Sequence, residues 1–338
     1  MDKSFKRKYN SSIIDMHTHL NPEYIDEAVR IMDRNSISMM FDITPNFGER
    51  LSRLKEAMSK YPSRFGWFGG IDFSTIDESG WVNKQVDNLE RFVEEGAAGI
   101  KLAKGLGLRH RDKLNKLIRV DDERISPIID KAGELGCVVA FHTADPKAFF
   151  EPLNKQNERW EELHNNPDWW FGDRNKHPYT WWDLIRQLET VILRHPNTTI
   201  MGVHFGCAAE EVGYVVDIMR HNSNYIVDIA ARVGELGRHE ATYIKDIFIE
   251  FQDRILFGTD LGVNKPMMLG APQPFEPTDK DIDEFYAAHW RYFETEEKNI
   301  DHPTPIQGDW QVNAIDLPKE TLSLFYKDNA TQYLLNKN

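Results

Sequence analysis

The sequence predicts an α/β fold of the (β/α)8 or TIM barrel type. Eight short apolar runs rich in β-branched residues alternate with amphipathic stretches along the 338 residues, a pattern typical of a parallel sheet covered by helices. No glycine-rich phosphate-binding fingerprint follows the first run, which disfavours a doubly wound sheet. Length alone allows one or two domains, but barrels often exceed about 250 residues as one unit. We therefore expect one domain over residues 1–338.

The expected elements alternate along the whole chain. The strands are expected at 12–20, 36–44, 64–73, 97–103, 137–143, 198–206, 224–230 and 254–260. The helices are expected at 22–35, 47–60, 79–95, 124–135, 180–194, 209–221, 239–252 and 318–335. The third helix has the clearest periodicity, with one apolar face made of Trp81, Val82, Val86, Leu89 and Val93.

Three connections are longer than a barrel needs. They span 104–123 after the fourth strand, 144–179 after the fifth, and 261–317 after the eighth, where a further helix is expected near 281–298. Connections that follow a strand lie on the C-terminal face of a barrel, where active sites are built. We interpret these loop insertions as walls and lids of one site, with decorative loops or a subunit contact as the alternative.

Composition excludes several classes of protein. The chain has 41 basic and 54 acidic residues and a formal net charge of −13, which disfavours nucleic acid as a partner. No apolar stretch approaches the ~20 residues that span a bilayer, and the basic start MDKSFKRKYNSS lacks the apolar segment of a signal peptide. Cys137 and Cys207 lie in apolar runs and are expected to be reduced core residues. We expect a cytoplasmic protein, and leave open a signal removed before residue 1.

The first candidate for chemistry is the pair His17 and His19 at the end of the first strand. Residues two apart on a strand point the same way, so both imidazoles can face the barrel interior and share one metal ion. His-x-His alone is a weak signal in a chain with 12 histidines. Its significance comes from His142, His204 and Asp260, which end the fifth, sixth and eighth strands and complete a ligand set that zinc prefers.

Small residues precede these strand ends by two positions. Gly99 precedes Lys101, Ala140 precedes His142, and Gly202 and Gly258 stand before His204 and Asp260. They are expected to leave space for a metal cavity below the ligands, with bulges or close strand packing as the alternative.

The motifs DMHTHL, GIKL, AFH, GVHFG and ILFGTD, in this order, resemble the amidohydrolase superfamily, in the branch that contains several decarboxylases and lactonases. The resemblance runs from residue 13 to about 335, where KDNATQYL is similar to the closing helix of that branch. It implies one divalent metal, usually Zn²⁺ with Mn²⁺ as the alternative, on His17, His19, His142 and Asp260. His204 is implied beside the metal-bound water or the substrate. Lys101 is implied to be an uncarboxylated cation near the substrate, with a carboxylated bridging lysine as the alternative. Dimers are common in this superfamily, so a homodimer remains open.

The implied chemistry is metal-dependent hydrolysis of a small amide, ester or lactone. Zinc lowers the pKa of its water to about 7, and Asp260 would take that proton and pass it to the leaving group. His204 would orient the water or polarise the carbonyl. The alternative is a decarboxylase that acts on an aromatic or unsaturated acid and delivers a proton to carbon. A non-catalytic binding barrel is disfavoured by the intact set of ligand-like strand ends.

Substrate-binding residues are predicted on weaker grounds. Arg232 after the seventh strand, and Arg109 or Arg111 in the basic loop, could pair with a substrate carboxylate, with surface ion pairs as the alternative. Asp228 is interpreted as holding Arg232 in place, and Asp15 as a partner of the metal ligands or an internal polar group. Four tryptophans could stack on a small-molecule substrate or pack the second insertion: Trp169, Trp170, Trp181 and Trp182.

Overall fold

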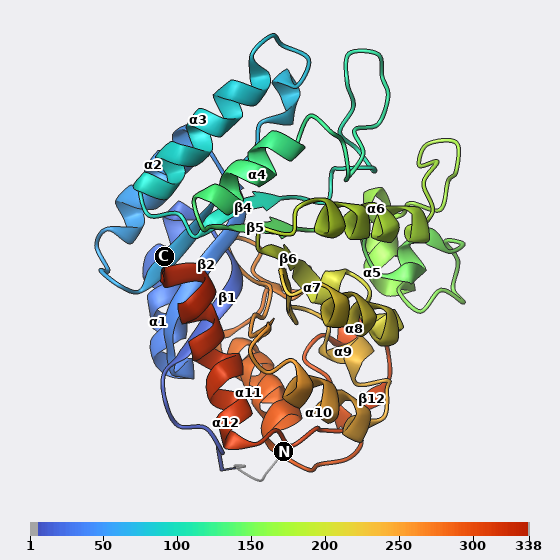
Figure 1. Ribbon diagram of the computed structural model, residues 1–338. Helices are drawn as coiled ribbons and strands as arrows, with labels where there is room; N and C mark the ends of the chain where they lie inside the picture. Colours follow the sequence, from blue (N-terminus) through green and yellow to red (C-terminus); the bar gives the residue numbers. More distant parts are fainter. Residues whose placement is uncertain (1–5, 337–338) are drawn as a thin grey trace.

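The computed structural model describes residues 6–336 and shows a (β/α)8 barrel (Figure 1). The predicted domain bounds also include residues 1–5 and 337–338, which lie outside the described residues. The main sheet has the order β10-β9-β1-β2-β3-β4-β5-β6-β7-β8, and its neighbouring strands are parallel except for the β9–β10 pair. Its strands are β1 (Ile13–Leu20), β2 (Ile37–Asn46), β3 (Phe65–Gly70), β4 (Gly99–Leu102), β5 (Val138–Phe141), β6 (Ile200–Gly202), β7 (Tyr225–Asp228), β8 (Ile255–Leu256), β9 (Leu261–Val263) and β10 (Met268–Leu269).

The eighth barrel strand is divided into β8 and β9, whereas the sequence predicted one strand over 254–260. β8 pairs with β7 and β9 pairs with β1, which closes the barrel. Two hydrogen bonds bridge the break: Met16 N donates to the Phe257 carbonyl at 3.1 Å, and Asp260 N donates to the His17 carbonyl at 2.8 Å. Asp260 has a φ of 64°, so the chain turns at this residue and directs it away from a regular strand.

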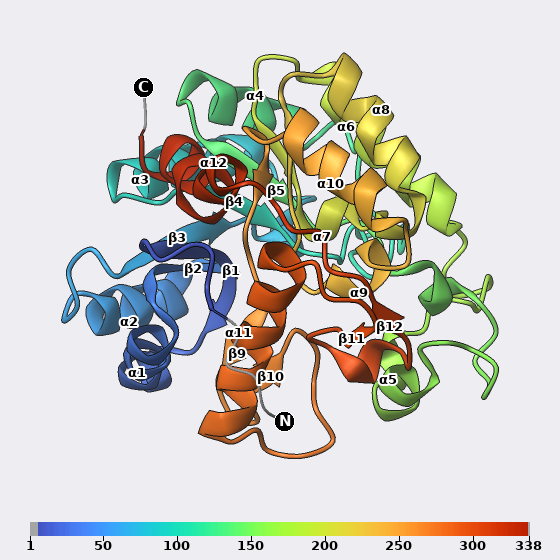
Figure 2. The ribbon, with the colours of Figure 1, turned by 90° about the horizontal axis from the view of Figure 1, so that it is seen from below.

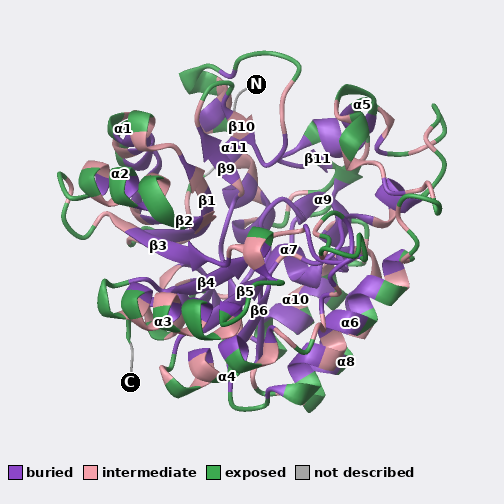
Figure 3. Ribbon diagram, turned by 90° about the horizontal axis from the view of Figure 1, so that it is seen from above, coloured by how far each residue is buried: buried purple, intermediate pink, exposed green. Residues whose placement is uncertain are grey.

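The main helices surround the strands, and Figure 2 shows α1 and α2 on one side with α6, α8 and α10 on the other. They are α1 (Ile25–Asn35), α2 (Gly48–Met58), α3 (Trp81–Glu94), α4 (Ser126–Glu134), α6 (Trp181–Arg194), α8 (Val212–His221), α10 (Ala241–Glu250) and α12 (Lys319–Ser323), which continues in π-helical turns to Leu335. None of the helices within residues 6–336 is long and apolar enough to cross a membrane. Figure 3 shows buried strands at the centre and exposed residues on the outer sides of the helices and loops.

The barrel interior is packed with apolar side chains and is not hollow. Ile14, Met16, Phe68, Met201 and Leu256 belong to one buried cluster, to which Ala140 also contributes from beneath His142. The prediction that the small residues leave a cavity is wrong for Gly99, Gly202 and Gly258, because a Cβ on each of them would collide with a neighbouring strand. It would lie 1.8 Å from the Val138 carbonyl oxygen at Gly99, 2.2 Å from the Tyr225 hydroxyl at Gly202, and 2.5 Å from His17 Cβ at Gly258. These glycines permit close strand packing.

The long segments after β4, β5 and β9 cover the C-terminal face. The segment after β5 carries α5 (Trp160–Asn165), and the segment after β9 carries α11 (Asp279–Glu294) and the hairpin β11 (Ile300–Asp301) and β12 (Gln311–Val312). α5 contacts the turn Pro305–Gln307, and Figure 2 shows α5 beside this hairpin. Two short helical turns complete the face: α7 (Val203–Gly206) and α9 (Val233–Leu236). Cys137 and Cys207 are both buried in the hydrophobic core, as the sequence predicted.

Candidate metal centre and active site

β1 brings His17 and His19 to the C-terminal end of the barrel. The pairing of β1 with β2 has an irregularity between Asp15 and Thr18, which interrupts the strict alternation expected from the sequence. His17 is fully buried, and 30% of the His19 side chain is exposed. Their rings lie edge-on with centroids 5.6 Å apart.

The hydrogen bonds of His17 define which ring nitrogen carries its proton. His17 Nδ1 lies 3.0 Å from Asp228 Oδ2, so Nδ1 is the donor when the carboxylate is ionised. His17 Nε2 then presents a lone pair, has no hydrogen-bond partner within the described chain, and lies 3.6 Å from Asp260 Oδ1. Burial lowers the His17 pKa despite the neighbouring Asp228, which favours this neutral form.

His19 is oriented in the same way by β2. Its Nδ1 lies 2.8 Å from the Thr44 hydroxyl, and that hydroxyl donates to Asp42 Oδ1 at 2.8 Å. Because the Thr44 proton is committed to Asp42, the hydroxyl accepts from His19 Nδ1. His19 Nε2 therefore also presents a lone pair, 3.2 Å from Asp260 Oδ1.

Three lone-pair donors thus converge at one point. His17, His19 and Asp260 each offer a ligand atom within 4.8 Å of the others, and the buried Asp260 Oδ1 has no hydrogen bond to any residue from 6 to 336. These three atoms all carry lone pairs and have no proton between them, so they repel one another unless a cation binds between them. Two imidazoles and a carboxylate are a ligand set that suits zinc. Burial raises the Asp260 pKa, but contact with His19 and the charges of His17 and His19 outweigh it and lower the pKa to about 2. The residues present fit a divalent metal ion.

His204 stands beside this cluster after β6, where the predicted strand 198–206 ends early at Gly202. His204 and Phe205 both have left-handed backbone angles (φ 57° and 55°), which turn the chain. His204 Nδ1 lies 2.8 Å from the Ala230 carbonyl, which can only accept a hydrogen bond, so Nδ1 carries the proton. In the neutral ring Nε2 then carries a lone pair. Burial and the nearby His142 hold the His204 pKa far below its usual value, so the ring is neutral.

Asp228 holds the His17 imidazole and the backbone of His204, and among the described residues it makes no hydrogen bond or ion pair with Arg232, contrary to the sequence interpretation. Its Oδ1 accepts from the backbone amides of His204 at 3.0 Å and Ala230 at 2.9 Å, while Oδ2 accepts from His17. Its position at the end of β7 is the same signal that identified the other strand-end residues. The same rule applied to the seventh strand could have assigned it this role.

His142, the fourth predicted ligand, lies next to the cluster in a different contact. Its Nε2 is 3.3 Å from Asp145 Oδ1, and its ring lies edge-on to His204 with centroids 4.6 Å apart. Burial lowers the His142 pKa to about 4 even though Asp145 opposes this shift. Its role as a ligand stays a prediction.

Lys101 lies at the end of β4 and is 2% exposed. Its Nζ has no hydrogen-bond partner within the described chain. Burial lowers its pKa to about 8, and the charges of Asp228 and Asp260 limit the shift. Lys101 is therefore mostly protonated at neutral pH.

Asp15 is an internal polar group that joins ligand-bearing segments. Its carboxylate accepts from the Thr259 hydroxyl at 2.6 Å, the Thr259 amide at 3.1 Å and the Tyr286 hydroxyl of α11 at 2.8 Å. Burial raises its pKa to about 7, and these hydrogen bonds limit the rise. Asp15 touches neither imidazole ring through a hydrogen bond.

A small chamber lies beside the cluster and is lined by His142, His204, Asp260 and residues of the long insertions. Arg232 and Trp169 line this chamber. A second cavity is lined by His19 and Thr44, and Met268 lines both cavities.

Arg109 and Trp170, both predicted to bind substrate, lie outside the chamber. Arg109 Nη2 donates to the Asp168 carbonyl at 2.7 Å, and Trp170 Nε1 donates to the Glu151 carbonyl at 2.7 Å. Both line a separate surface pocket with His177. In the segment after β5, Trp169 lines the chamber and its neighbour Trp170 does not. Periodicity in the sequence could not predict these different orientations.

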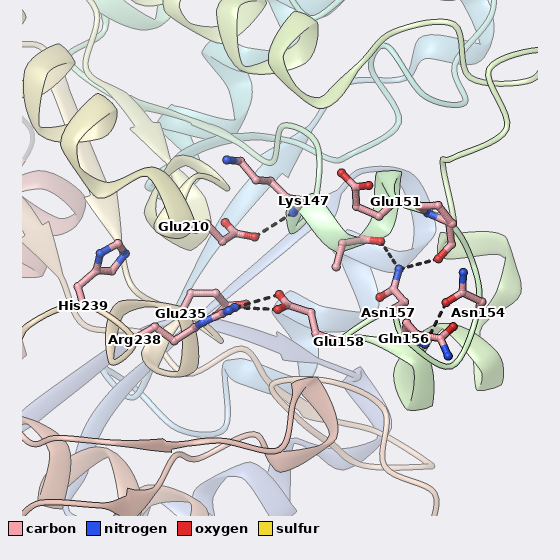
Figure 4. A pocket seen from close by; sticks show the side chains of 12 residues that line it. Lys147, Glu151, Asn154, Gln156, Asn157, Glu158, Glu210, Glu235, Arg238 and His239 are labelled. Carbon is pink, nitrogen blue, oxygen red and sulfur yellow. Dashed lines mark hydrogen bonds and ion pairs between the residues drawn. The ribbon is translucent and has the colours of Figure 1, made fainter.

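A larger cavity lies outside the site, between the second insertion and the segment after β7 (Figure 4). Its walls include Lys147, Glu158, Glu210, Glu235 and Arg238, and none of the clustered histidines. Figure 4 shows Arg238 paired with Glu158 across it. It is distinct from the chamber beside the metal cluster.

The fold is a barrel with a group of residues that could hold a metal ion at its C-terminal end, and the comparisons identify the family. The amidohydrolase family profile matches residues 56–334, so the chain belongs to the amidohydrolase family. The match begins after His17 and His19, which the structure itself places beside Asp260. No curated protein sequence matches the chain.

Several solved structures share the fold. A 2,6-dihydroxybenzoate decarboxylase from Rhizobium has a TM-score of 0.55 at 16% identity, covering 96% of this chain and 98% of that chain. An amidohydrolase II structure has a TM-score of 0.53 at 16% identity, covering 96% and 100%. An amidohydrolase 2 from Bifidobacterium longum subsp. infantis has a TM-score of 0.50 at 10% identity, covering 96% and 99%. At these identities the similarity establishes the fold alone.

Proposed function

We propose that this protein is a metal-dependent hydrolase of a small amide, ester or lactone. His17, His19 and Asp260 would hold one divalent ion, Zn²⁺ or alternatively Mn²⁺, with His142 as the fourth ligand. The observation that carries the proposal is the convergence of two imidazole lone pairs on a carboxylate oxygen that has no hydrogen bond. A divalent ion bound there would acidify a water molecule and polarise the substrate carbonyl.

Asp260 is suited to move the proton of the attacking water. Its pKa of about 2 keeps it ionised at neutral pH, and it lines the chamber. A carboxylate of low basicity returns a proton readily, so Asp260 can pass it to the leaving nitrogen or oxygen. The free Nε2 of neutral His204 can accept a hydrogen bond from the water and orient it.

Lys101 is suited to stabilise the oxyanion that forms as the carbonyl is attacked. It is buried and mostly protonated, and its Nζ has no hydrogen-bond partner in the part of the chain that the structure describes. A fixed cation in a site of low dielectric stabilises developing negative charge strongly.

Decarboxylation of an aromatic or unsaturated acid is the second candidate. The observation that favours it is the same protonated Lys101, which could deliver a proton to carbon, whereas neutral His204 has none on its free nitrogen. The relatives named 2,6-dihydroxybenzoate decarboxylase share only the fold with this chain.

Metal analysis and product analysis in H₂¹⁸O test these candidates together. Hydrolysis predicts about one divalent ion per chain and ¹⁸O in the product. Release of carbon dioxide without ¹⁸O incorporation would favour the lyase. A purified protein without bound metal, and with unchanged ligand affinity in Asp260→Asn, would refute both.

A further inference from the structure

Three cationic side chains line the chamber, and two of them are neutralised. Lys104 Nζ lies 2.9 Å from Asp145 Oδ2. Arg159 on the second insertion is 1% exposed and pairs with Glu162 at 3.0 Å and also with Glu235. Because Glu235 also lines the cavity of Figure 4, the Arg159–Glu235 pair lies between that cavity and the chamber.

Arg232 is the exception among these cations. It is 4% exposed and makes no direct ion pair with a carboxylate among residues 6–336, although the charge of Glu162, which pairs with Arg159, acts on it at longer range. Its Nη1 donates to the Ala231 carbonyl at 2.7 Å, and its buried Nε has no hydrogen-bond partner within the described chain. At least the Nε–H donor of Arg232 therefore remains without an acceptor among the described residues.

A guanidinium keeps its positive charge in a protein. Burying a charge without a directly paired counter-charge is unfavourable. Such a charge is retained most readily where a ligand supplies the missing anion. Arg232 lines the same chamber as His204 and Asp260, so an anion bound to Arg232 would lie beside the reacting centre.

We propose that Arg232 binds an anionic group of the substrate, of the carboxylate class, inside this chamber. The proposal rests on the proposed function, because it names the substrate class of the same site. The planar donor fork of arginine fits a carboxylate, and the aromatic walls Phe149 and Trp169 suit an apolar body attached to it. The proposed substrate is a small apolar molecule with one carboxylate next to the group that reacts.

Binding of benzoate and benzamide to the metal-loaded protein tests this inference by calorimetry. The two probes have nearly the same shape and differ in charge. Wild-type protein should bind benzoate and bind benzamide at least about 10-fold more weakly. Arg232→Met should weaken benzoate binding about 10- to 100-fold, as expected for loss of a hydrogen-bonded charge, and keep its metal content. Arg232→Lys, which keeps the charge and loses the fork, should be intermediate.

Arg238→Met is the matched control, because Arg238 is exposed, pairs with Glu158 and lies outside the chamber. It should leave benzoate affinity unchanged. Arg232→Met should unfold at the same temperature as wild type or higher, because it removes a buried unpaired charge. Equal benzoate binding in wild type and Arg232→Met would overturn the inference. So would benzoate binding that survives in Arg232→Met and disappears when metal is removed, since the carboxylate would then sit on the metal.

The result is separable from the test of the proposed function. If benzoate binds through Arg232 while the protein takes up no divalent metal, the anion subsite is supported and the metal-dependent function fails. If metal binds and ¹⁸O enters the product of a neutral ester as efficiently as that of a carboxylated one, the function stands and the anion subsite is wrong.

Discussion

Thr44 touches the metal cluster only through His19, so replacing it tests whether imidazole orientation matters. Its hydroxyl bridges His19 Nδ1 and Asp42 Oδ1, each at 2.8 Å. Thr44→Val keeps the shape and removes the acceptor, which leaves the His19 proton unpaired and the ring free to adopt the other tautomer. Loss of such an outer partner typically lowers metal affinity about 10- to 100-fold, or roughly 1.4 to 2.7 kcal/mol.

The assay is competitive zinc titration against a chromophoric chelator. Thr44→Ser keeps the hydroxyl and should retain wild-type affinity. Thr18→Val is the stability control, because the Thr18 hydroxyl donates to the Phe41 carbonyl at 2.7 Å and touches no imidazole; it should cost about 1 kcal/mol of folding free energy with little change in zinc affinity. Equal zinc affinity in Thr44→Val and wild type would refute the assignment of His19 Nε2 as a ligand.

Three other perturbations follow from buried contacts. Burial raises the Asp15 pKa from 3.8 to about 7, so between these pH values the native state holds a proton that the unfolded chain has lost. In urea unfolding of the metal-free protein, the stability of wild type relative to Asp15→Asn should therefore fall by on the order of 4 kcal/mol from about pH 4 to pH 7. A difference between the two proteins that does not change with pH would contradict this. Glu235→Gln breaks the buried pair with Arg159 and should cost about 3 kcal/mol, whereas Arg220→Gln on the exposed surface should cost less than about 1 kcal/mol in the same unfolding assay. Met268→Ala should join the two cavities beside the metal cluster and lower KM for bulkier substrates, and unchanged size selectivity would show that Met268 is not the partition.

The order of elements was predictable because hydrophobic periodicity is local. The predicted ends of the first and fifth strands, at residues 20 and 143, are close to the observed ends at Leu20 and Phe141. A parallel barrel brings the C-terminal ends of its strands to one face whatever lies between them, so Asp260 reaches the same face although β8 ends at Leu256. The metal cluster was therefore accessible to sequence reasoning through His17, His19 and Asp260.

What could not be predicted depends on contacts between distant segments. The irregularity in β1 and the left-handed turn at His204 break the alternation on which the parity argument depended. The buried environment of Arg159 is created by Glu235 after β7, and no local pattern in the second insertion indicates it. The same holds for Trp169 and Trp170, whose opposite orientations depend on where the insertion packs.

The candidate metal centre depends on barrel closure because its imidazoles are oriented by groups on or after other strands, β2 and β7. His17 is held by Asp228 of β7, His19 by Thr44 of β2, and His204 by the carbonyl of Ala230 after β7. Asp260, the carboxylate they face, is tied to β1 through its amide bond to the His17 carbonyl. The lone pairs converge only when β1 lies against both β2 and the divided eighth strand. A metal ion that binds this arrangement and not the open chain stabilises the closed barrel by the full free energy of its binding, so the same contacts that orient the ligands couple the site to the fold.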